Sequence, residues 1–277
     1  MAPSSYIIVG SGVFGASTAL YLIRKYPDAS IILVDRDHYD ASTRVAASWD
    51  WNKVVRADYG DLLYTKLALE AQRLWRTDPI WQPYYHESGV VWISQSAFAQ
   101  NAVDNFARLG TEADVQVISV EDAREIYDGA FRNADYTGIT NVLVNRNSGW
   151  AEAKEALQST IRAAVSLGVK YVTAEVKAVS LRGEGHARRC RGIFTADGTL
   201  LSADCVVLST GAFTPKLLIN SDPDWIDLHA GERITAAAVT EATAALGDEQ
   251  GAALGSMPVS INDNPIDRGT AVLLHDS

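Results

Sequence analysis

Three glycines with the spacing G-x-G-x-x-G lie near the start of the chain, at Gly10, Gly12 and Gly15. The first glycine permits a tight turn, the second lets a pyrophosphate approach the backbone, and the third allows a helix to pack closely on a strand. The amide groups at the start of that helix would then face the anion. The spacing therefore indicates a dinucleotide site, provided that a strand precedes the turn and a helix follows it.

The segments on both sides of the glycines meet this condition. Residues 6–9 form an apolar run that predicts a buried strand, and apolar residues recur at helical spacing from residue 16 until Pro27. A second apolar run at 31–34 predicts another strand, which ends at Asp35, 20 residues after Gly15 (35 − 15 = 20). A carboxylate there can accept a hydrogen bond from a ribose hydroxyl and repels a 2′-phosphate, although Arg36 beside it weakens that repulsion. FAD and NAD are thus favoured over NADP, and the choice between them stays open on this evidence.

Composition excludes several other classes of function. The 277 residues include 24 Lys+Arg against 34 Asp+Glu, and the net charge of −10 argues against nonspecific binding to nucleic acid or anionic membranes. No apolar run approaches the roughly 18–20 residues of a spanning helix, and the first residues lack the pattern of a secretory signal. We therefore expect an intracellular protein, cytoplasmic or peroxisomal, although the last three residues are not a peroxisomal signal. Neither the two cysteines nor the five histidines have the spacing of a metal site, so no metal is expected.

Alternating strand and helix patterns continue along the chain and predict an α/β fold. Helices are expected at 59–76, 98–109 and 150–167, with a short one from 121, and strands at 89–93, 115–120, 169–173, 176–181, 190–195 and 205–210. The segment 234–246 is compatible with either a helix or a strand. The irregular stretch 41–57 directly follows the second predicted strand, which is typical of a ligand-facing loop.

Several motifs together resemble a known family. They are 9–17 (VGSGVFGAS), 33–36 (LVDR), 52–59 (NKVVRADY), 147–150 (NSGW) and 209–218 (STGAFTPKLL). The chain resembles, over essentially its whole length, the flavin-dependent amine oxidases of the D-amino-acid oxidase superfamily. The most similar branch contains monomeric sarcosine oxidase, fungal fructosyl-amino-acid oxidase and saccharopine/pipecolate oxidase.

The resemblance implies a fold and an activity. The fold would be a Rossmann-like, three-layer FAD-binding domain of the glutathione-reductase type, formed by 1–88 and 147–218, with an interleaved α+β substrate domain of 89–146 and 219–277. The activity would be FAD-dependent oxidation of a C–N bond in a secondary amine, an N-substituted amino acid or a glycated amino acid, with oxygen as acceptor and hydrogen peroxide as product.

The resemblance also assigns roles to particular residues. Those expected to bind the cofactor are Gly10, Ser11, Gly12, Val13, Phe14 and Gly15 at the pyrophosphate, Asp35 and Arg36 at the ribose, Ser42, Ser48, Asn52 and Lys53 on the loop toward the isoalloxazine, Val176 near the adenine, and Gly211 and Ala212 along the crevice. Lys53 would be a cation near the flavin, and Arg56 would bind the substrate carboxylate; a fixed cation stabilises negative charge in a dry site. The alternative for both is a surface cation that pairs with Asp50 or Asp58.

Members of this branch are longer than this chain, so we expect an incomplete C-terminal part. The absent portion would hold the rest of the substrate sheet, a lysine that assists oxygen reduction and the cysteine that often carries the flavin. Neither Cys190 nor Cys205 matches that cysteine, so a covalent flavin is not expected. Two other functions stay open: a non-catalytic FAD-binding module that needs a second chain, and an NAD-dependent dehydrogenase, against which the 52–59 motif argues.

Overall fold

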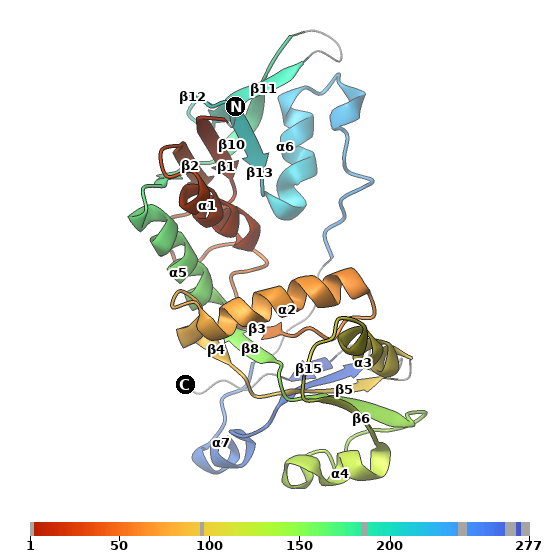
Figure 1. Cartoon of the computed structure of the whole chain (residues 1–277). Coiled ribbons are helices and arrows are strands. Elements are labelled where there is room, and N and C mark those ends of the chain that lie inside the picture. Colours follow the sequence, from red (N-terminus) through yellow and green to blue (C-terminus); the bar gives the residue numbers. More distant parts are fainter. Residues whose placement is uncertain (1–2, 95–96, 184–187, 238–242, 264–269, 273–277) are drawn as a thin grey trace. The chain divides into compact units, whose positions relative to one another are not determined.

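The computed structural model describes residues 3–94, 97–183, 188–237, 243–263 and 270–272 (Figure 1). The chain divides into two compact units. One contains Met1–Asp50 and Lys154–Glu241, and the other contains Trp51–Ala153 and Ala242–Ser277. The strands at 52–55 and 85–86 pair with the strand at 149–152, so these segments belong to the second unit, whereas the expected cofactor domain includes them. Which residues form the functional cofactor domain stays a prediction.

A four-stranded parallel sheet forms the centre of the first unit. Its strands are β1 (Ser5–Val9), β2 (Ser30–Asp35), β9 (Lys170–Thr173) and β13 (Cys205–Leu208), in the order β13-β1-β2-β9. Helix α1 (Val13–Lys25) connects β1 to β2, as the hydrophobic pattern predicts. Because every neighbouring pair is parallel, the carboxyl ends of all four strands lie along one edge, where ligands bind in open α/β sheets.

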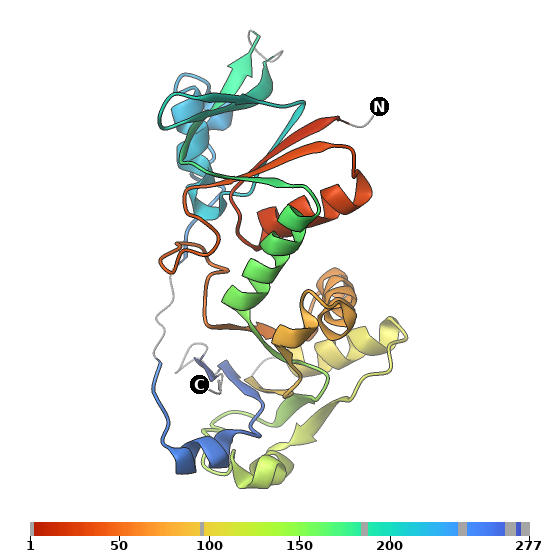
Figure 2. The ribbon, with the colours of Figure 1, turned by 90° about the vertical axis from the view of Figure 1, so that its left-hand side faces the viewer.

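The first unit has three layers, as expected. Helix α1 packs on one face of the parallel sheet, and an antiparallel meander of β10 (Val176–Arg182), β11 (Arg189–Thr195) and β12 (Leu200–Ser202) covers the other (Figure 2). Ile7 and Val9 of β1 pack against Val179 and Ile193 of the meander. Ile8 points the opposite way and is also fully buried, which explains why β1 reads as a continuous apolar run. Three more elements complete this unit: α5 (Ala153–Ser166), which leads into β9, the turn η3 (Gly211–Phe213), and α6 (Thr214–Ser221), which packs on β10.

The second unit contains a five-stranded mixed sheet and a smaller antiparallel one. The larger sheet has the order β15 (Thr270–Val272), β14 (Val259–Asp263), β5 (Val90–Ser94), β7 (Asn141–Asn145) and β6 (Val115–Ser119). Helices α3 (Phe98–Arg108) and α4 (Val120–Gly129) lie on its opposite faces, since Leu143 of β7 packs with α3 and its neighbours Val142 and Val144 pack with α4 (Figure 1). The smaller sheet is β3 (Asn52–Val55), β8 (Gly149–Glu152) and β4 (Tyr85–His86), and helices α2 (Leu62–Thr77) and α7 (Asp248–Leu254) belong to the same unit.

Several elements differ from their sequence-based prediction, and β3 is a strand inside the stretch 41–57, which was expected to be irregular. Helix α2 begins three residues late because the Asp61 carboxylate accepts hydrogen bonds from the backbone N–H groups of Leu63 and Tyr64 and caps it. Helix α5 begins at Ala153 because residues 149–152 pair with β3 and β4 instead. In the segment 234–246, residues 234–237 and 243–246 are neither helix nor strand, and 238–242 lie outside the described residues. The described part of the chain contains no helix long and apolar enough to cross a membrane.

Candidate functional site

The glycine turn lies between β1 and α1, at the carboxyl edge of the parallel sheet. Gly10 has a φ of +93°, and its N–H donates to the carbonyl oxygen of Val34 at 2.7 Å. A methyl group on Gly10 would lie 2.5 Å from the carbonyl oxygen of Ser209, and one on Gly15 would lie 1.8 Å from the carbonyl oxygen of Gly10. The turn thus brings α1 against β1 and against the end of β13 at distances that no larger residue permits.

The start of α1 is the part of the turn that could receive an anion. Gly12 is the N-cap of α1, and the space beside its Cα is nearly open. The nearest atom to an added methyl group would be Ser48 Oγ, at 3.3 Å. Ser48 Oγ also accepts a hydrogen bond from the N–H of Val13 at 3.1 Å. The first turn of α1 carries no acidic residue, so the positive end of the helix dipole is not neutralised there. The side chains of Val13 and Phe14 are exposed, and Phe14 is 79% exposed.

Asp35, at the end of β2, is bound to the glycine turn. Its Oδ2 accepts hydrogen bonds from the backbone N–H of Ser11 at 2.7 Å and from the Ser11 hydroxyl at 2.9 Å. Its Oδ1 accepts from the N–H of Asp37 at 3.1 Å. The carboxylate therefore stabilises the turn in addition to lying where the sequence predicts a ribose contact.

Two residues that the sequence analysis did not single out complete this cluster. The Arg44 side chain is only 1% exposed, and its Nη2 donates to Ser11 Oγ at 2.5 Å and to Asp35 Oδ2 at 3.3 Å. Tyr171, on β9, contacts Ser11 Oγ at 3.0 Å and donates to the carbonyl oxygen of Asp37 at 2.6 Å. Burial raises the pKa of Tyr171 to about 12. Neither residue has a motif around it: Arg44 is an arginine in an irregular loop, and Tyr171 reads as an ordinary strand residue.

Most of the other predicted cofactor residues of the first unit lie close to this edge. The Arg36 guanidinium carbon is 5.9 Å from the ring centroid of Phe213, directly after Gly211 and Ala212 in η3. Val176, at the start of β10, packs in the cluster that contains Val9. Ser42 is exposed on the loop after β2. Their contacts with a cofactor stay a prediction.

The remaining predicted residues, Asn52, Lys53 and Arg56, belong to the second unit. Asn52 and Lys53 are neighbours on β3, so their side chains point to opposite faces of the small sheet, and Lys53 is exposed. Arg56 directly follows β3. Lys53 and Arg56, the two predicted catalytic cations, are three residues apart in the sequence (56 − 53 = 3).

The Arg56 side chain lies between two aromatic rings. Its guanidinium carbon is 4.2 Å from the ring centroid of Tyr59 and 4.5 Å from that of Trp92, on β5. Its Nη1 donates to the backbone carbonyl oxygen of Asp58. Burial lowers the pKa of Arg56, while Tyr59 and Asp58 oppose that shift. When aromatic rings cover the faces of a guanidinium, its N–H groups can donate further hydrogen bonds only in its plane. A carboxylate can accept two such bonds side by side.

The Asp58 carboxyl group is fully buried and holds this segment in place. It accepts hydrogen bonds from Asn145 Nδ2 at 2.5 Å and from Ser148 Oγ at 3.3 Å, and Gln72 of α2 donates to Ser148 Oγ at 3.3 Å. Burial raises the pKa of Asp58, although the hydrogen bond from Asn145 and the charge of Arg56 oppose the rise. The carboxylate is thus satisfied by neutral donors, and Arg56 contacts Asp58 through its backbone.

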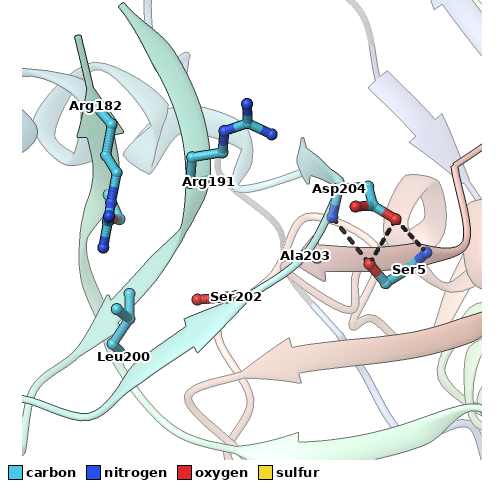
Figure 3. A pocket seen from close by; sticks show the side chains of 8 residues that line it. Ser5, Arg182, Arg191, Leu200, Ser202, Ala203 and Asp204 are labelled. Carbon is cyan, nitrogen blue, oxygen red and sulfur yellow. Dashed lines mark hydrogen bonds between the residues drawn. The ribbon is translucent and has the colours of Figure 1, made fainter.

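A hollow of about 400 Å³ lies at the opposite end of the first unit (Figure 3). It is bounded by Ser5, where β1 begins, and by Asp204, just before β13, so it lies at the amino ends of these strands. Hydrogen bonds from Ser4 and Ser5 lower the pKa of Asp204 and occupy its Oδ2. The glycine turn is at the carboxyl edge, so this hollow is separate from it.

The described residues contain no group of His, Cys, Asp and Glu that could hold a metal ion.

Known proteins resemble this chain in sequence and in fold. L-saccharopine oxidase of Schizosaccharomyces pombe is 31% identical over 91% of this chain, which covers 59% of that protein. Fructosamine oxidase of Aspergillus fumigatus (Amadoriase II) superposes with a TM-score of 0.69 at 25% identity, over 94% of this chain and 58% of that one. Fructosyl peptide oxidase of Aspergillus nidulans gives a TM-score of 0.72 at 23% identity, over 95% of this chain and 60% of that one. The chain therefore spans about three fifths of the length of these relatives.

The sequence profile of one family covers nearly the whole chain. That family is described as FAD dependent oxidoreductase, and the match extends over residues 5–256. The glycine turn, Asp35 and the parallel sheet all lie inside this range. This chain therefore belongs to the FAD-dependent oxidoreductase family.

Proposed function

We propose that this chain is the larger part of an FAD-dependent oxidase that acts on the C–N bond of an N-substituted or glycated amino acid. The supporting observation is the turn from Gly10 to Gly15 beside Asp35, at the carboxyl edge of a parallel sheet. The relatives that support this substrate class are a saccharopine oxidase and two oxidases of fructosyl compounds. We propose oxygen as the electron acceptor.

The residues around the turn fit an FAD molecule. Gly12 leaves room above the start of α1 that a side chain would fill, and the helix start carries no opposing acid. Buried nitrogen atoms of Arg44 have no hydrogen-bond partner among the described residues, as expected where a polar ligand completes a site. FAD, when bound, accepts two electrons from the amine and passes them to oxygen. The balanced outcome is that the amine loses two electrons and two protons to become an imine, and oxygen gains both to become hydrogen peroxide.

Arg56 is the residue that we propose for binding the substrate carboxylate. Its guanidinium is partly buried between Tyr59 and Trp92, where a hydrogen bond to an anion is stronger than in water. The guanidinium group of arginine does not lose its proton in proteins, so Arg56 carries a positive charge. Held between the rings, the guanidinium would fix the orientation of an amino acid rather than take part in the electron transfer. Lys53 is proposed as the cation that stabilises negative charge developing near the flavin.

The proposal is tested by a spectrum and a peroxide assay on the purified chain. A flavin that is released by acid precipitation would show noncovalent FAD. Saccharopine, pipecolate, sarcosine and fructosyl-amino acids are then screened for peroxide formation and for changes in the flavin spectrum. A chain that binds FAD but gives neither response with any of these compounds would contradict the substrate class.

The role of Arg56 is tested separately with Arg56→Met. Loss of a charge-assisted hydrogen bond raises KM, or the Kd from the flavin spectrum, by about ten- to a hundredfold for a substrate with a carboxylate. The change stays within about threefold for the matching amine without one. Arg132→Met is the matched control in the same unit, because Arg132 is 60% exposed and pairs with Glu125. Equal losses for both compounds would mean that Arg56 does not recognise the carboxylate.

A second function is suggested by the share of the relatives' length that this chain covers. Because the chain spans about three fifths of their length, it is also compatible with a non-catalytic FAD-binding module that needs a second chain. Peroxide formation by the chain alone, above the rate of free FAD, would rule this alternative out.

A further inference from the structure

Arg44 is a buried arginine with an incomplete set of partners. Its side chain is 1% exposed, and all of its hydrogen bonds are made by Nη2. Its Nε and Nη1 are buried and have no partner among the residues that the structure describes. A buried donor without an acceptor is costly, and a buried charge more so, which is why such groups in folded proteins usually have a partner or a ligand. The two nitrogen atoms therefore require an acceptor that the described residues do not supply.

The position of Arg44 indicates where that acceptor lies. Nη2 donates to the carbonyl oxygen of Ser11 at 3.3 Å, to its hydroxyl at 2.5 Å and to Asp35 Oδ2 at 3.3 Å. Ser11 is the residue between the first two glycines of the turn. The hydroxyl group of Ser48, on the same loop as Arg44, accepts a hydrogen bond from the N–H of Val13. The loop after β2 thus places a guanidinium and a hydroxyl on the glycine turn itself.

We propose that Arg44 is a cofactor-binding residue whose Nε and Nη1 donate to a phosphate oxygen in the ADP half of FAD. The proposal rests on FAD binding and adds an assignment to it, because neither the glycine spacing nor Asp35 implies an arginine here.

A phosphate is favoured over a ribose hydroxyl for two reasons. The forked guanidinium matches the geometry of a phosphate, and both groups are fully charged. In addition, Arg44 and Asp35 together carry no net charge, so Arg44 removes the repulsion that a lone Asp35 carboxylate would exert on a pyrophosphate. The ring of Trp49, whose centroid is 5.2 Å from the Arg44 guanidinium carbon, adds a cation–π contact that holds the guanidinium at the turn.

A purely structural role makes a different prediction. If Arg44 only holds Asp35 and Ser11 together, its loss lowers the stability of the first unit and weakens the binding of every ligand of the turn to the same extent. If Arg44 binds phosphate, its loss weakens ligands that contain phosphate and spares those that do not. Comparison of ADP with adenosine therefore separates the two roles.

The experiment is an equilibrium titration of the full chain, freed of flavin, with FAD, ADP and adenosine. The variants are Arg44→Met, which has no charge, and Arg44→Lys, which keeps the charge without the fork. For Arg44→Met we expect the Kd for FAD and for ADP to rise by about ten- to a hundredfold, whereas the Kd for adenosine stays within about twofold of the wild-type value. For Arg44→Lys the ADP loss is smaller, about three- to tenfold. Arg162→Met is the control in the same unit, because Arg162 is 55% exposed and pairs with Asp40.

Each outcome bears on the proposal. Unchanged ADP affinity in a folded Arg44→Met variant overturns it, and so does an equal weakening of ADP and adenosine. If Arg44→Met does not fold, as judged by circular dichroism, Arg44→Lys decides in the same way by its ratio of ADP to adenosine affinities. A wild-type chain that binds neither FAD nor ADP overturns this inference together with FAD binding. Normal FAD binding without peroxide would instead contradict only the proposed oxidase activity.

Discussion

Substitution of two glycines in the same turn should separate folding from cofactor binding. At Gly15 an added methyl group would lie 1.8 Å from the carbonyl oxygen of Gly10 and 3.3 Å from Ser209 Cβ. Ordinary contacts of such a methyl group begin at about 3.4 Å, so α1 would have to move by more than an ångström from the turn. At Gly12 the nearest atom is Ser48 Oγ at 3.3 Å, which a shift of a few tenths of an ångström relieves, and the φ of −66° suits alanine.

The two variants therefore differ in the free energy of unfolding. Alanine gains about 1 kcal/mol over glycine inside a helix, but overpacking costs about 1–3 kcal/mol and here involves backbone rather than a flexible side chain. We expect Gly15→Ala to lose about 1–2 kcal/mol, which is about 2–8 °C in Tm for a domain of this size. Gly12→Ala stays within about 0.5 kcal/mol of the wild type. Gly12→Ala should nevertheless raise the Kd for FAD by at least tenfold, because its methyl group occupies the space that the pyrophosphate needs.

The assay is urea unfolding of the flavin-free protein, followed by titration with FAD. Gly231→Ala, in the same unit, serves as a control for the general effect of replacing a glycine, because nothing lies within 4 Å of a methyl group there and its φ is outside the left-handed region. A Gly15→Ala variant as stable as the wild type would refute the close approach of α1 to the turn. A Gly12→Ala variant with normal FAD affinity would show that the pyrophosphate does not lie over Gly12.

Two further substitutions test buried groups through the pH dependence of unfolding. Burial raises the pKa of Asp58, so between its unfolded and folded pKa values the folded chain binds more protons, and stability falls as the pH rises through that window. Asp58→Asn cannot titrate, so the difference in unfolding free energy between wild type and variant should change, in favour of the variant, as the pH rises above the ordinary aspartate pKa of about 4; a flat difference would contradict the raised pKa. Tyr171→Phe should lose about 1 kcal/mol at neutral pH, since the carbonyl oxygen of Asp37 loses its donor. In urea titrations between about pH 10 and about pH 12, wild type should lose more stability than Tyr171→Phe, by at most about 2.7 kcal/mol and by less with partial exposure; equal losses would contradict the raised pKa of Tyr171.

The fold of the first unit was predictable because its signals are local. Two apolar runs, a glycine turn and a helical pattern lie within the first 35 residues, and their lengths and the glycines between them favour strand, turn, helix and strand in that order. The boundary of α5 was not predictable in this way. Residues 149–152 continue the helical pattern of 153–166, but they pair with β3 and β4, which are distant in sequence. Pairing between distant strands overrides local propensity there.

The candidate sites show the same limit at the level of single residues. Asp35 was predictable because its distance from Gly15 is fixed by the intervening helix and strand. Arg44 was not, because an arginine in an irregular loop usually points to solvent, and only the structure shows that it is buried against Ser11. The sequence suggests for Asp58 only a surface pairing with Lys53 or Arg56, whereas its carboxyl group is fully buried and accepts a hydrogen bond from Asn145.

The order of the strands has a consequence for how this chain matures on the ribosome. Strand β1 lies between β2 and β13, and Ser4 bonds Asp204, 200 residues away. At about 5–20 residues per second, the N-terminal segment has been exposed for about 10–40 s before β13 is made. During this time one edge of β1 has no neighbour, and the glycine turn lacks its contact with Ser209. Nascent chains should therefore acquire flavin only after β13 has emerged, and chaperones that cover unpaired strand edges would act on this protein before any flavin can.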